Sequence, residues 1–476
     1  MSVSGVDKTY SNFFYKWEKC RAVVEGEDSV KSKRELYLPR PSGMDEEDYN
    51  AYLQRAQFFN ATGRTVDGLC GMLGRKEPII EIPKGFEKYL ENVDGKGHSF
   101  KQFIPICTKD YIITNWGGVL VDMSKTDGVV SQYDFEQSDL STNMIFYKAE
   151  SIKKINWRFL GSKQLLNYII LKENVEVPTS EYETESREYR RVCDIDEEGY
   201  YRQTLYNERG TILEQINPTN KNGEKFRFIP FWLFANTDSP ENSKILDLAN
   251  VNLSHFRKSA DYENGLHWTG VPTPWSQGAD VDVKVVNGVE VAEPLKLGGS
   301  VVLNLPAGGS MHYLEFSGSG CSQLAQGMDS DEQRMAILGA RIISQEKKGV
   351  ESAETAEIHR AGENSILADI AINLSHVFTN ILRFYLKWSS GVEFNEDEVK
   401  VKLNTDYNVA RMSSAQLTAL VSLWQAGGIA QSDLFDNLKE GEIISVDRKL
   451  DEMNSEIQEE QLAKTNAMQN TNIETV

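Results

Sequence analysis

Residues 351–388 have the sequence ESAETAEIHRAGENSILADIAINLSHVFTNILRFYLKW. The stretch has no proline, and its apolar residues recur mostly every three or four positions. This spacing predicts one apolar stripe along a single long helix, which at 1.5 Å per residue would span roughly 57 Å. We expect such a helix to act as a strut between other parts of the fold. The stripe comprises Ile358, Ala361, Ile366, Ile370, Leu374, Val377, Ile381, Tyr385 and Trp388.

Two more helices are predicted before this strut, separated by an insert rich in glycine and proline. Apolar periodicity marks the two helices over residues 243–269 and 321–343. The insert, residues 270–320, carries an Asn-Gly pair between valines at 287–288, which is typical of a tight β-hairpin turn. The order helix, β-rich insert, helix predicts an insert presented on a two-helix stalk. A short break at residues 344–352 then leads to the strut.

The remaining segments alternate between helical and strand patterns. Asp45 stands before three acidic residues and predicts the capped start of a helical stripe that continues to Leu73, with a break at Gly63. A β-meander is expected over residues 151–206, because its apolar residues alternate or run together. Together these patterns predict an α+β fold. Further expected elements are a helix at 100–115, strands at 119–122, 226–234, 301–305, 311–316 and 399–403, and closing helices at 412–426, 432–438 and 446–468.

Size and charge limit the possible functions. A chain of 476 residues is too long for one hydrophobic core and predicts about three domains. Its formal net charge is −20, whereas proteins that hold DNA tightly neutralise phosphates with Lys and Arg. The charge therefore argues against tight nucleic-acid binding and permits weak contact. With no signal-peptide pattern and no long apolar run, we expect an intracellular protein without a membrane partner.

Few patterns in the sequence point to chemistry. The five cysteines lie far apart, so buried free thiols are expected instead of disulfides or a zinc site. The six histidines have no metal-ligand spacing, and Gly318-Ser319-Gly320 lacks the lysine of a phosphate-binding loop. We expect no catalytic residue, no metal and no cofactor. The 71 acidic residues nevertheless leave a hydrolase with paired carboxylates as an alternative.

Three stretches of the chain resemble the portal proteins of tailed bacteriophages, the head-to-tail connector family. They are YLPRPSGMDEEDYNAYLQRAQFFNATGRTVDGLCGMLGRKEP at residues 37–78, ADYENGLHWTGVPTPWSQG at 260–278 and ILGARIISQEKKGVESAETAEIHRAGENS at 337–365. The similarity covers about residues 35 to 440. The first residues and the acidic C-terminal tail have no clear counterpart in the family.

This resemblance implies a structural role without enzymatic activity. Portal subunits form a ring, usually of twelve copies, at one vertex of the capsid, so the protein would belong to the virion and to the host cytoplasm during assembly. Double-stranded DNA passes through the ring during packaging and ejection. The implied partners are the terminase large subunit, a head-completion or adaptor protein, and the major capsid or scaffolding protein.

The predicted segments follow the order of the parts of a portal. The resemblance assigns residues 1–242 to the wing, 243–269 and 321–343 to the stem helices, 270–320 to the clip, 344–352 to the tunnel loop, 353–390 to the long helix of the wing, 391–411 to a wing strand and 412–476 to the crown and acidic tail.

The resemblance also implies site residues. Lys347 and Lys348 are a short basic pair in the predicted break between two long helices. They either lie in solvent as ordinary surface charges or face DNA in the channel. Gly362 is a candidate kink because glycine lowers the cost of bending a helix; a straight helix that tolerates one glycine is the alternative. The implied tunnel-loop residues are Gln345, Lys347, Lys348 and Gly349, and the implied clip contacts for terminase or adaptor are Trp275, Asp280, Asp282, Asn287 and Gly288.

Two other functions stay open at this point. One is a different connector or adaptor ring of the head-tail junction, although simpler adaptors lack an insert between two stem helices. The other is a hydrolase of cell-wall glycan that uses paired carboxylates, whose mark would be a pocket with two facing acids.

Overall fold

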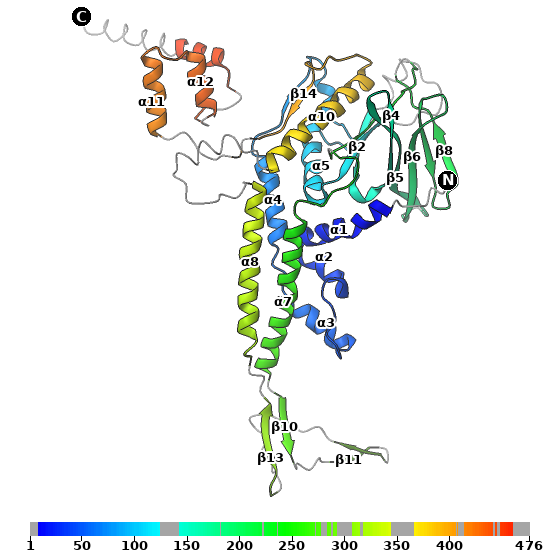
Figure 1. The fold of residues 1–476 in the computed structure, drawn as a ribbon, viewed down its shortest axis with the longest axis vertical. Coiled ribbons are helices and arrows are strands. Elements are labelled where there is room, and N and C mark those ends of the chain that lie inside the picture. The colour runs from blue at the N-terminus through cyan, green and yellow to red at the C-terminus, as the bar shows by residue number, and fades with distance from the viewer. Residues whose placement is uncertain are drawn as a thin grey trace, which may run out of the picture. The chain divides into compact units, whose positions relative to one another are not determined.

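The chain forms two compact units, Met1–Thr405 and Asp406–Val476. The computed structural model describes residues 8–459 apart from 124–141, 181, 221–222, 236, 272, 278–282, 287–288, 293–306, 315–317, 344–365, 406, 408–413, 441–442 and 445–447. Helices and strands both contribute to the first unit, as the α+β prediction requires (Figure 1).

Helix α10 (Ile366–Ser390) is the centre of the first unit's core. It packs against a three-stranded antiparallel sheet with strand order β3-β2-β9. The sheet consists of β2 (Gly117–Met123), β3 (Thr142–Lys148) and β9 (Phe231–Leu233), and helix α5 (Phe100–Thr114) packs against β2 as well. Aromatic side chains fill the contact: Phe378 of α10 lies 6.1 Å from Phe100 and 5.6 Å from Phe234, measured between ring centroids. The described part of the predicted strut is therefore a core helix.

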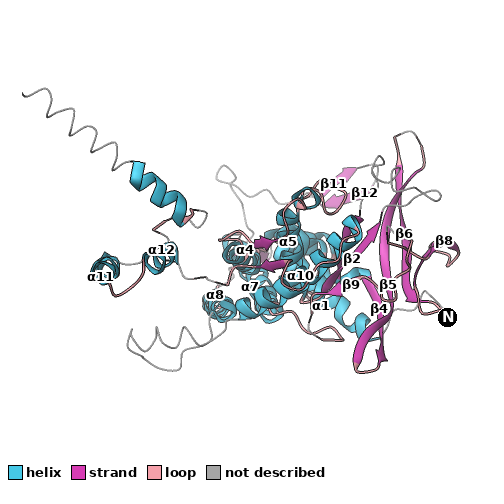
Figure 2. Ribbon diagram, turned by 90° about the horizontal axis from the view of Figure 1, so that it is seen from above, coloured by secondary structure: helices cyan, strands magenta, loops and turns pink. Residues whose placement is uncertain are grey.

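A five-stranded antiparallel meander lies next to β2 and β9, on the side away from α10 in Figure 2. Its strands follow in chain order: β4 (Ile152–Leu160), β5 (Lys163–Pro178), β6 (Thr184–Ile195), β7 (Tyr201–Tyr206) and β8 (Ile212–Ile216). The meander predicted for residues 151–206 is confirmed, with β8 as one more strand.

The strand predicted for residues 226–234 is wrong for its first half. Only Phe231–Leu233 form strand β9, which pairs with β2. Pro230 has no backbone N–H to donate and its carbonyl accepts a hydrogen bond from Val121 N at 2.9 Å, so regular pairing begins after the proline.

Four helices precede β2 in addition to α5. They are α1 (Lys8–Glu25), α2 (Glu27–Ser32), α3 (Glu46–Arg55) and α4 (Ala61–Leu73), with short 3-10 turns η1 (Arg34–Leu36), η2 (Glu87–Leu90) and, after β3, η3 (Ala149–Ser151). Asp45 caps α3 as predicted, and its side chain accepts a hydrogen bond from Asp48 N at 2.8 Å.

The helix break predicted at Gly63 is wrong. The chain leaves the helix at Ala56 and re-enters it after Asn60, whose side chain caps α4 by accepting from Gly63 N at 2.9 Å. Gly63 lies inside α4 because α1 passes very close there: a Cβ atom at position 63 would stand 2.6 Å from the carbonyl oxygen of Val24. The glycine serves close packing, not a break in the helix.

Helices α7 (Leu246–Gly270) and α8 (Cys321–Ile343) pack on each other, and we call this pair the stalk (Figure 1). Their bounds match the helices predicted for residues 243–269 and 321–343. Between them the chain forms two antiparallel strand pairs, β10 (Thr273–Gln277) with β13 (Ser310–Leu314) and β11 (Val283–Val286) with β12 (Val289–Ala292). The β-rich character of the insert is thus confirmed, whereas the strand predicted at 301–305 lies outside the described residues.

Short elements complete both units. Strand β14 (Lys400–Lys402), predicted at residues 399–403, pairs with β1 (Ile79–Glu81). The second unit contains α11 (Ser414–Gln425), α12 (Gln431–Glu440) and a helix over residues 450–459. No helix among the described residues is both long and apolar enough to cross a membrane. All five cysteines are free thiols, and every one except Cys70 is buried.

Candidate functional site

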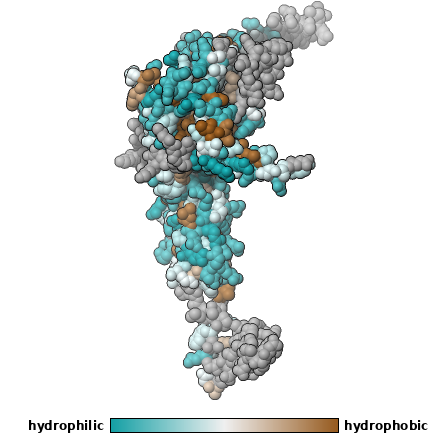
Figure 3. Space-filling model, turned by 90° about the vertical axis from the view of Figure 1, so that its right-hand side faces the viewer, coloured by the Kyte–Doolittle hydropathy of each residue, from teal (hydrophilic) through white to brown (hydrophobic). Residues whose placement is uncertain are grey.

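The stalk leaves most of the surface of α8 uncovered by its own chain. Among residues 321–339 of α8, only Cys321, Asp331, Met335 and Gly339 are buried. They lie on the side that packs on α7 and α4, whereas glutamines and charged residues make up six of the nine exposed positions. Figure 3 accordingly shows a mainly hydrophilic stalk surface, with more hydrophobic side chains on the part of the molecule above it.

A partly buried ion pair joins the two stalk helices. Lys258 Nζ of α7 lies 2.6 Å from Asp331 Oδ2 of α8, and Asp331 is almost fully buried. Arg334 Nη1 approaches the other carboxylate oxygen of Asp331 at 3.6 Å, with its own side chain 66% exposed. Leaving the buried Asp331 carboxylate unpaired would cost free energy. The pair therefore favours the one alignment of α8 along α7 in which Lys258 reaches Asp331.

The segment at residues 37–62 binds along α7 through polar contacts. Ser259 Oγ donates to Gln57 O at 2.7 Å and accepts from Gln57 N at 2.8 Å. The Asn252 side chain accepts from Thr62 N at 3.1 Å and donates to Phe59 O at 2.8 Å. Asn252 and Ser259 are seven residues apart, about two turns of α7, so the first half of the stalk is held against the rest of the first unit.

A cavity of about 370 Å³ lies on one edge of the stalk, between α7, α8 and residues 57–59. Three carboxylates line it, those of Glu263, Asp329 and Glu332, together with His255 and with apolar side chains that include Phe59 and Met328. The described lining residues include no lysine or arginine. His255 Nε2 lies 3.4 Å from Glu332 Oε1.

Exposed aromatic side chains gather where the stalk meets the insert. Trp268 near the end of α7 is 51% exposed, Trp275 in β10 is 44% exposed and Tyr313 in β13 is 59% exposed. Trp275 pairs across the strands with His312, and their ring centroids are 5.5 Å apart. Tryptophan and tyrosine are the residues most enriched at binding hot spots, so this end of the stalk has the composition of a docking surface.

Of the residues predicted to form sites, Trp275 is described, and it lies on the exposed β10–β13 pair. The other predicted clip contacts, Asp280, Asp282, Asn287 and Gly288, lie outside the described residues, although strands β11 and β12 flank the Asn-Gly pair as expected. The predicted tunnel-loop residues Gln345, Lys347, Lys348 and Gly349 and the predicted kink Gly362 also lie outside the described residues.

The Lys258–Asp331 pair and the acid-lined cavity were not predicted from the sequence. One signal was available: Asp331 falls within an apolar stripe of α8 that recurs every three or four residues. An acid in such a stripe needs a partner, but its identity depends on how α7 and α8 meet. The stripe is Cys321, Leu324, Met328, Asp331, Met335 and Leu338.

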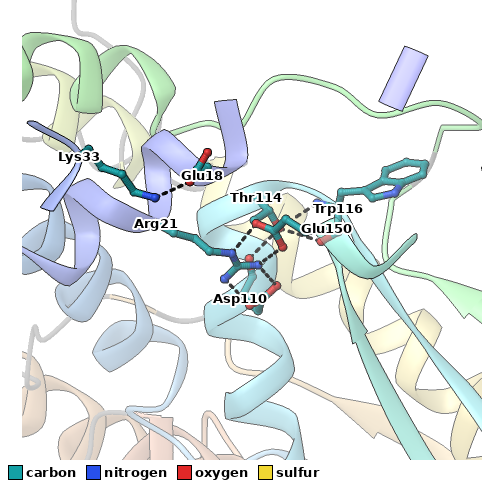
Figure 4. Close-up of polar contacts among 7 residues, drawn as sticks. All are labelled: Glu18, Arg21, Lys33, Asp110, Thr114, Trp116 and Glu150. Carbon is teal, nitrogen blue, oxygen red and sulfur yellow. Dashed lines mark hydrogen bonds and ion pairs between the residues drawn. The ribbon is translucent and has the colours of Figure 1, made fainter. Parts of the chain in front are cut away.

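A second polar cluster joins α1, α5 and η3, and Figure 4 shows its side chains. Arg21 lies between two carboxylates: its Nη1 is 2.7 Å from Asp110 Oδ1 and its Nη2 is 2.8 Å from Glu150 Oε2. Burial alone would lower the pKa of Arg21, but the hydrogen bonds to Glu150 and Asp110 outweigh it and raise the pKa above its ordinary value. Both acids are held by one guanidinium, an arrangement that fastens three segments together.

A third cluster ties the meander to β2. Arg191 Nε of β6 lies 2.6 Å from Glu173 Oε1, and its Nη1 lies 3.3 Å from Asp122 Oδ2. Gln203 Nε2 donates to Asp122 Oδ1 at 2.8 Å. Burial raises the pKa of Asp122, and the Arg191 charge and the Gln203 hydrogen bond oppose that rise. This cluster too consists of acids paired to an arginine inside the fold.

A larger cavity of about 580 Å³ lies beside β1, η2 and α5. Its lining includes three glutamates, Glu81, Glu87 and Glu91, all exposed to solvent. A catalytic acid of a glycoside hydrolase is usually held in an apolar pocket that keeps it protonated, which this exposed rim does not provide. No group of three or more His, Cys, Asp or Glu among the described residues could hold a metal ion.

Comparisons with known proteins give the following matches. The model of a domain of unknown function, DUF4055, matches residues 244–389, from the start of the stalk to the end of α10. No curated protein matches the chain. Among solved structures, a chain of the virion of a native gene transfer agent particle is 10% identical, with a TM-score of 0.38, and the match covers 85% of this chain and 97% of that chain.

Two further matches are chains of the necks of such particles. For the neck of an empty gene transfer agent particle computed with C6 symmetry, the identity is 12%, the TM-score is 0.38, and 86% of this chain and 97% of that chain are covered. For the neck of a native particle computed with C12 symmetry, the identity is 11%, the TM-score is 0.35, and the coverage is 86% and 98%. These scores are too low to establish a shared fold.

Proposed function

We propose that the chain is a portal subunit, a structural protein without enzymatic activity that assembles into a ring of twelve copies at one vertex of a capsid. The ring is a conduit for double-stranded DNA during packaging and ejection. It also serves as the docking platform for the terminase large subunit and, later, for a head-completion or adaptor protein. The protein then belongs to the virion and to the host cytoplasm during assembly.

The observation that carries this proposal is the order of α7, the β-rich insert and α8. The sequence resemblance implies a stem helix, a clip and a second stem helix in that order, and α7 and α8 begin and end within three residues of the implied bounds. Simpler adaptor rings lack such an insert, so the order favours a portal over another connector. Trp275, on the exposed β10–β13 pair, is the described residue that we assign to partner docking.

Charge supports the conduit role. A channel must release its DNA, and each additional phosphate contact with Lys or Arg would strengthen binding. A net charge of −20 and a polar α8 surface keep such contacts few. We assign Gln345, Lys347, Lys348 and Gly349 to the DNA-facing loop on the resemblance alone.

The contacts that the acidic side chains inside the fold make support a role without catalysis. Asp110 and Glu150 are both bound by Arg21, and Asp122 and Glu173 are both bound by Arg191. The oxygens of these carboxylates are bound by a guanidinium that joins separate segments of the fold, so they are not free to give a proton to a substrate. These acids therefore serve as fasteners between segments, and a glycan hydrolase is the less favoured function.

The first test is the mass of the assembled protein. Twelve copies of 53.8 kDa give a ring of about 650 kDa. Mass photometry and single-particle images of the full chain should show closed rings near this mass. Monomers or open chains under assembly-promoting conditions would contradict the proposal.

The second test concerns DNA. The double substitution Lys347→Glu with Lys348→Glu should leave ring assembly intact and impair DNA retention or translocation. The matched control is Lys400→Glu with Lys402→Glu, because both side chains are exposed on β14. Normal packaging by the Lys347/Lys348 variant would refute the assignment of this loop to the channel.

A further inference from the structure

The cavity on the edge of the stalk carries negative charge that its own chain does not balance. Glu263, Asp329 and Glu332 line it together with His255, and the described lining contains no lysine or arginine. His255 is only 6% exposed, and its Nδ1 has no hydrogen-bond partner in the described part of the chain. Three carboxylates facing one imidazole leave a site that favours a further cation.

The other edge of the stalk carries positive charge. Gly327, Asp331 and Arg334 follow at spacings of four and three, so they share one side of α8, and Lys258 binds Gly327 O and Asp331 from α7. Arg334 reaches Asp331 only at 3.6 Å, whereas Lys258 already holds that carboxylate at 2.6 Å. The guanidinium of Arg334 is therefore exposed and weakly held.

The two edges lie on opposite sides of the same helix. Glu332 and Arg334 are two residues apart, which places them about 200° apart around α8 and about 3 Å apart along it. The residues of α8 that line the cavity, Ala325, Met328, Asp329 and Glu332, share the Glu332 side. An acidic edge and a basic edge at nearly the same height are suited to pairing between copies arranged side by side.

We propose that Arg334 of one copy enters the acid-lined cavity of the neighbouring copy. This inference rests on the proposed ring and supposes that the stalk runs along its symmetry axis, so that Arg334 of one copy and the cavity of the next lie at nearly the same height. A ring uses two different mating faces on each copy, and the two stalk edges supply them. The apolar lining from Phe59 and Met328 suits the aliphatic part of an arginine, and the carboxylates suit its guanidinium.

The test is a charge-reversal cycle on the full chain. The substitutions Arg334→Glu and Glu332→Arg each place like charges opposite one another, so the concentration needed for half-maximal ring assembly should rise about tenfold or more in each. The double variant exchanges the two charges, although Glu263 and Asp329 stay in the cavity, and it should assemble at a concentration about threefold or more below that of either single variant, because the two sites are coupled. Mass photometry over a concentration series measures all four proteins.

Two controls separate this contact from general effects. Gln333→Glu adds a negative charge to the exposed position between the two residues and should assemble like the wild type. Circular dichroism should show the same helix content in every variant. If Arg334→Glu assembles at the wild-type concentration, or if the double variant is no better than the single ones, the contact is refuted while the ring stands. A wild type that stays monomeric refutes the ring and the contact together.

Discussion

Helices α10 and α8 are similar in length, with 25 and 23 residues, but they are covered in opposite ways. The chain buries α10 on several sides with β2, β3, β9 and aromatic side chains. It covers α8 on a narrow stripe only, and the uncovered positions are mainly polar. The packing of α10 therefore contributes to the stability of the fold, whereas α8 leaves surface available for contacts with other molecules.

The two helices also differ in the kind of contact that fixes them. Phe384 and Trp388 of α10 pack with Phe226 and Trp232 at centroid distances of 4.6 to 5.4 Å. In α8 the central buried residue is Asp331, held by Lys258. An ion pair forms in only a few relative positions of two helices, whereas apolar packing tolerates small shifts. The Lys258–Asp331 pair therefore defines the alignment of α8 on α7 while it adds little net stability.

The largest expected effect comes from Trp388→Ala. Trp388 is 1% exposed, its ring lies 4.6 Å from that of Phe226, and its Nε1 donates to Thr219 O at 3.1 Å. Its loss opens a cavity in the core and should lower the free energy of unfolding by about 3–5 kcal/mol. Urea denaturation of unassembled protein, followed by far-ultraviolet circular dichroism, measures it. Ile372→Ala on the exposed side of α10 is the control and should cost under about 1 kcal/mol.

The next effect concerns the ion pair of the stalk. Asp331→Ala removes the partner of Lys258 and should cost about 1–3 kcal/mol in urea denaturation. The cost stays below that of a fully buried pair because Lys258 is 31% exposed and can reach water. Asp329→Ala, an exposed aspartate on the same helix, should change stability by no more than about 0.5 kcal/mol. Equal effects of the two substitutions would show that α8 has no preferred buried face.

Helix α4 contacts the stalk as well as α1 and α5, and two of its glycines should respond in opposite directions. A Cβ atom at Gly63 would lie 2.6 Å from Val24 O, so Gly63→Ala should destabilise by about 1–3 kcal/mol. A Cβ atom at Gly68 would meet nothing within 4 Å, so Gly68→Ala should stabilise by about 0.4–1 kcal/mol. Thermal denaturation of both variants measures the difference, and a shift of the same sign in both would contradict the close approach of α1 and α4.

Local patterns in the sequence predicted the elements well because they depend on neighbouring residues. Periodicity placed α7, α8, α5 and the meander, and Asp45 marked the start of α3. The prediction for Gly63 failed because a glycine in a helix can signal either a break or a close neighbour. Only the position of α1, set by tertiary packing, distinguishes these two meanings.

The site was less predictable, for the same physical reason. The unusual place of Asp331 in an apolar stripe is visible in the sequence, but its partner Lys258 lies 73 residues earlier in the chain. The cavity combines side chains of α7, α8 and residues 57–59, so no local pattern contains it. Trp275 was predicted as a clip contact from the family resemblance, and its exposure follows from its place on the β10–β13 strand pair.

The smallest expected effect on stability comes from Trp275→Ala, the same substitution as Trp388→Ala in the other region. Trp275 is 44% exposed and contacts His312 across the strand pair, an interaction type worth about 0.2–1 kcal/mol. Circular dichroism in urea should therefore show a loss within that range. A loss near that of Trp388→Ala would mean that the β10–β13 pair is part of a folded core. The insert carried by the stalk could then not be a region that leaves its aromatic side chains to a partner, and the contrast with α10 would fail.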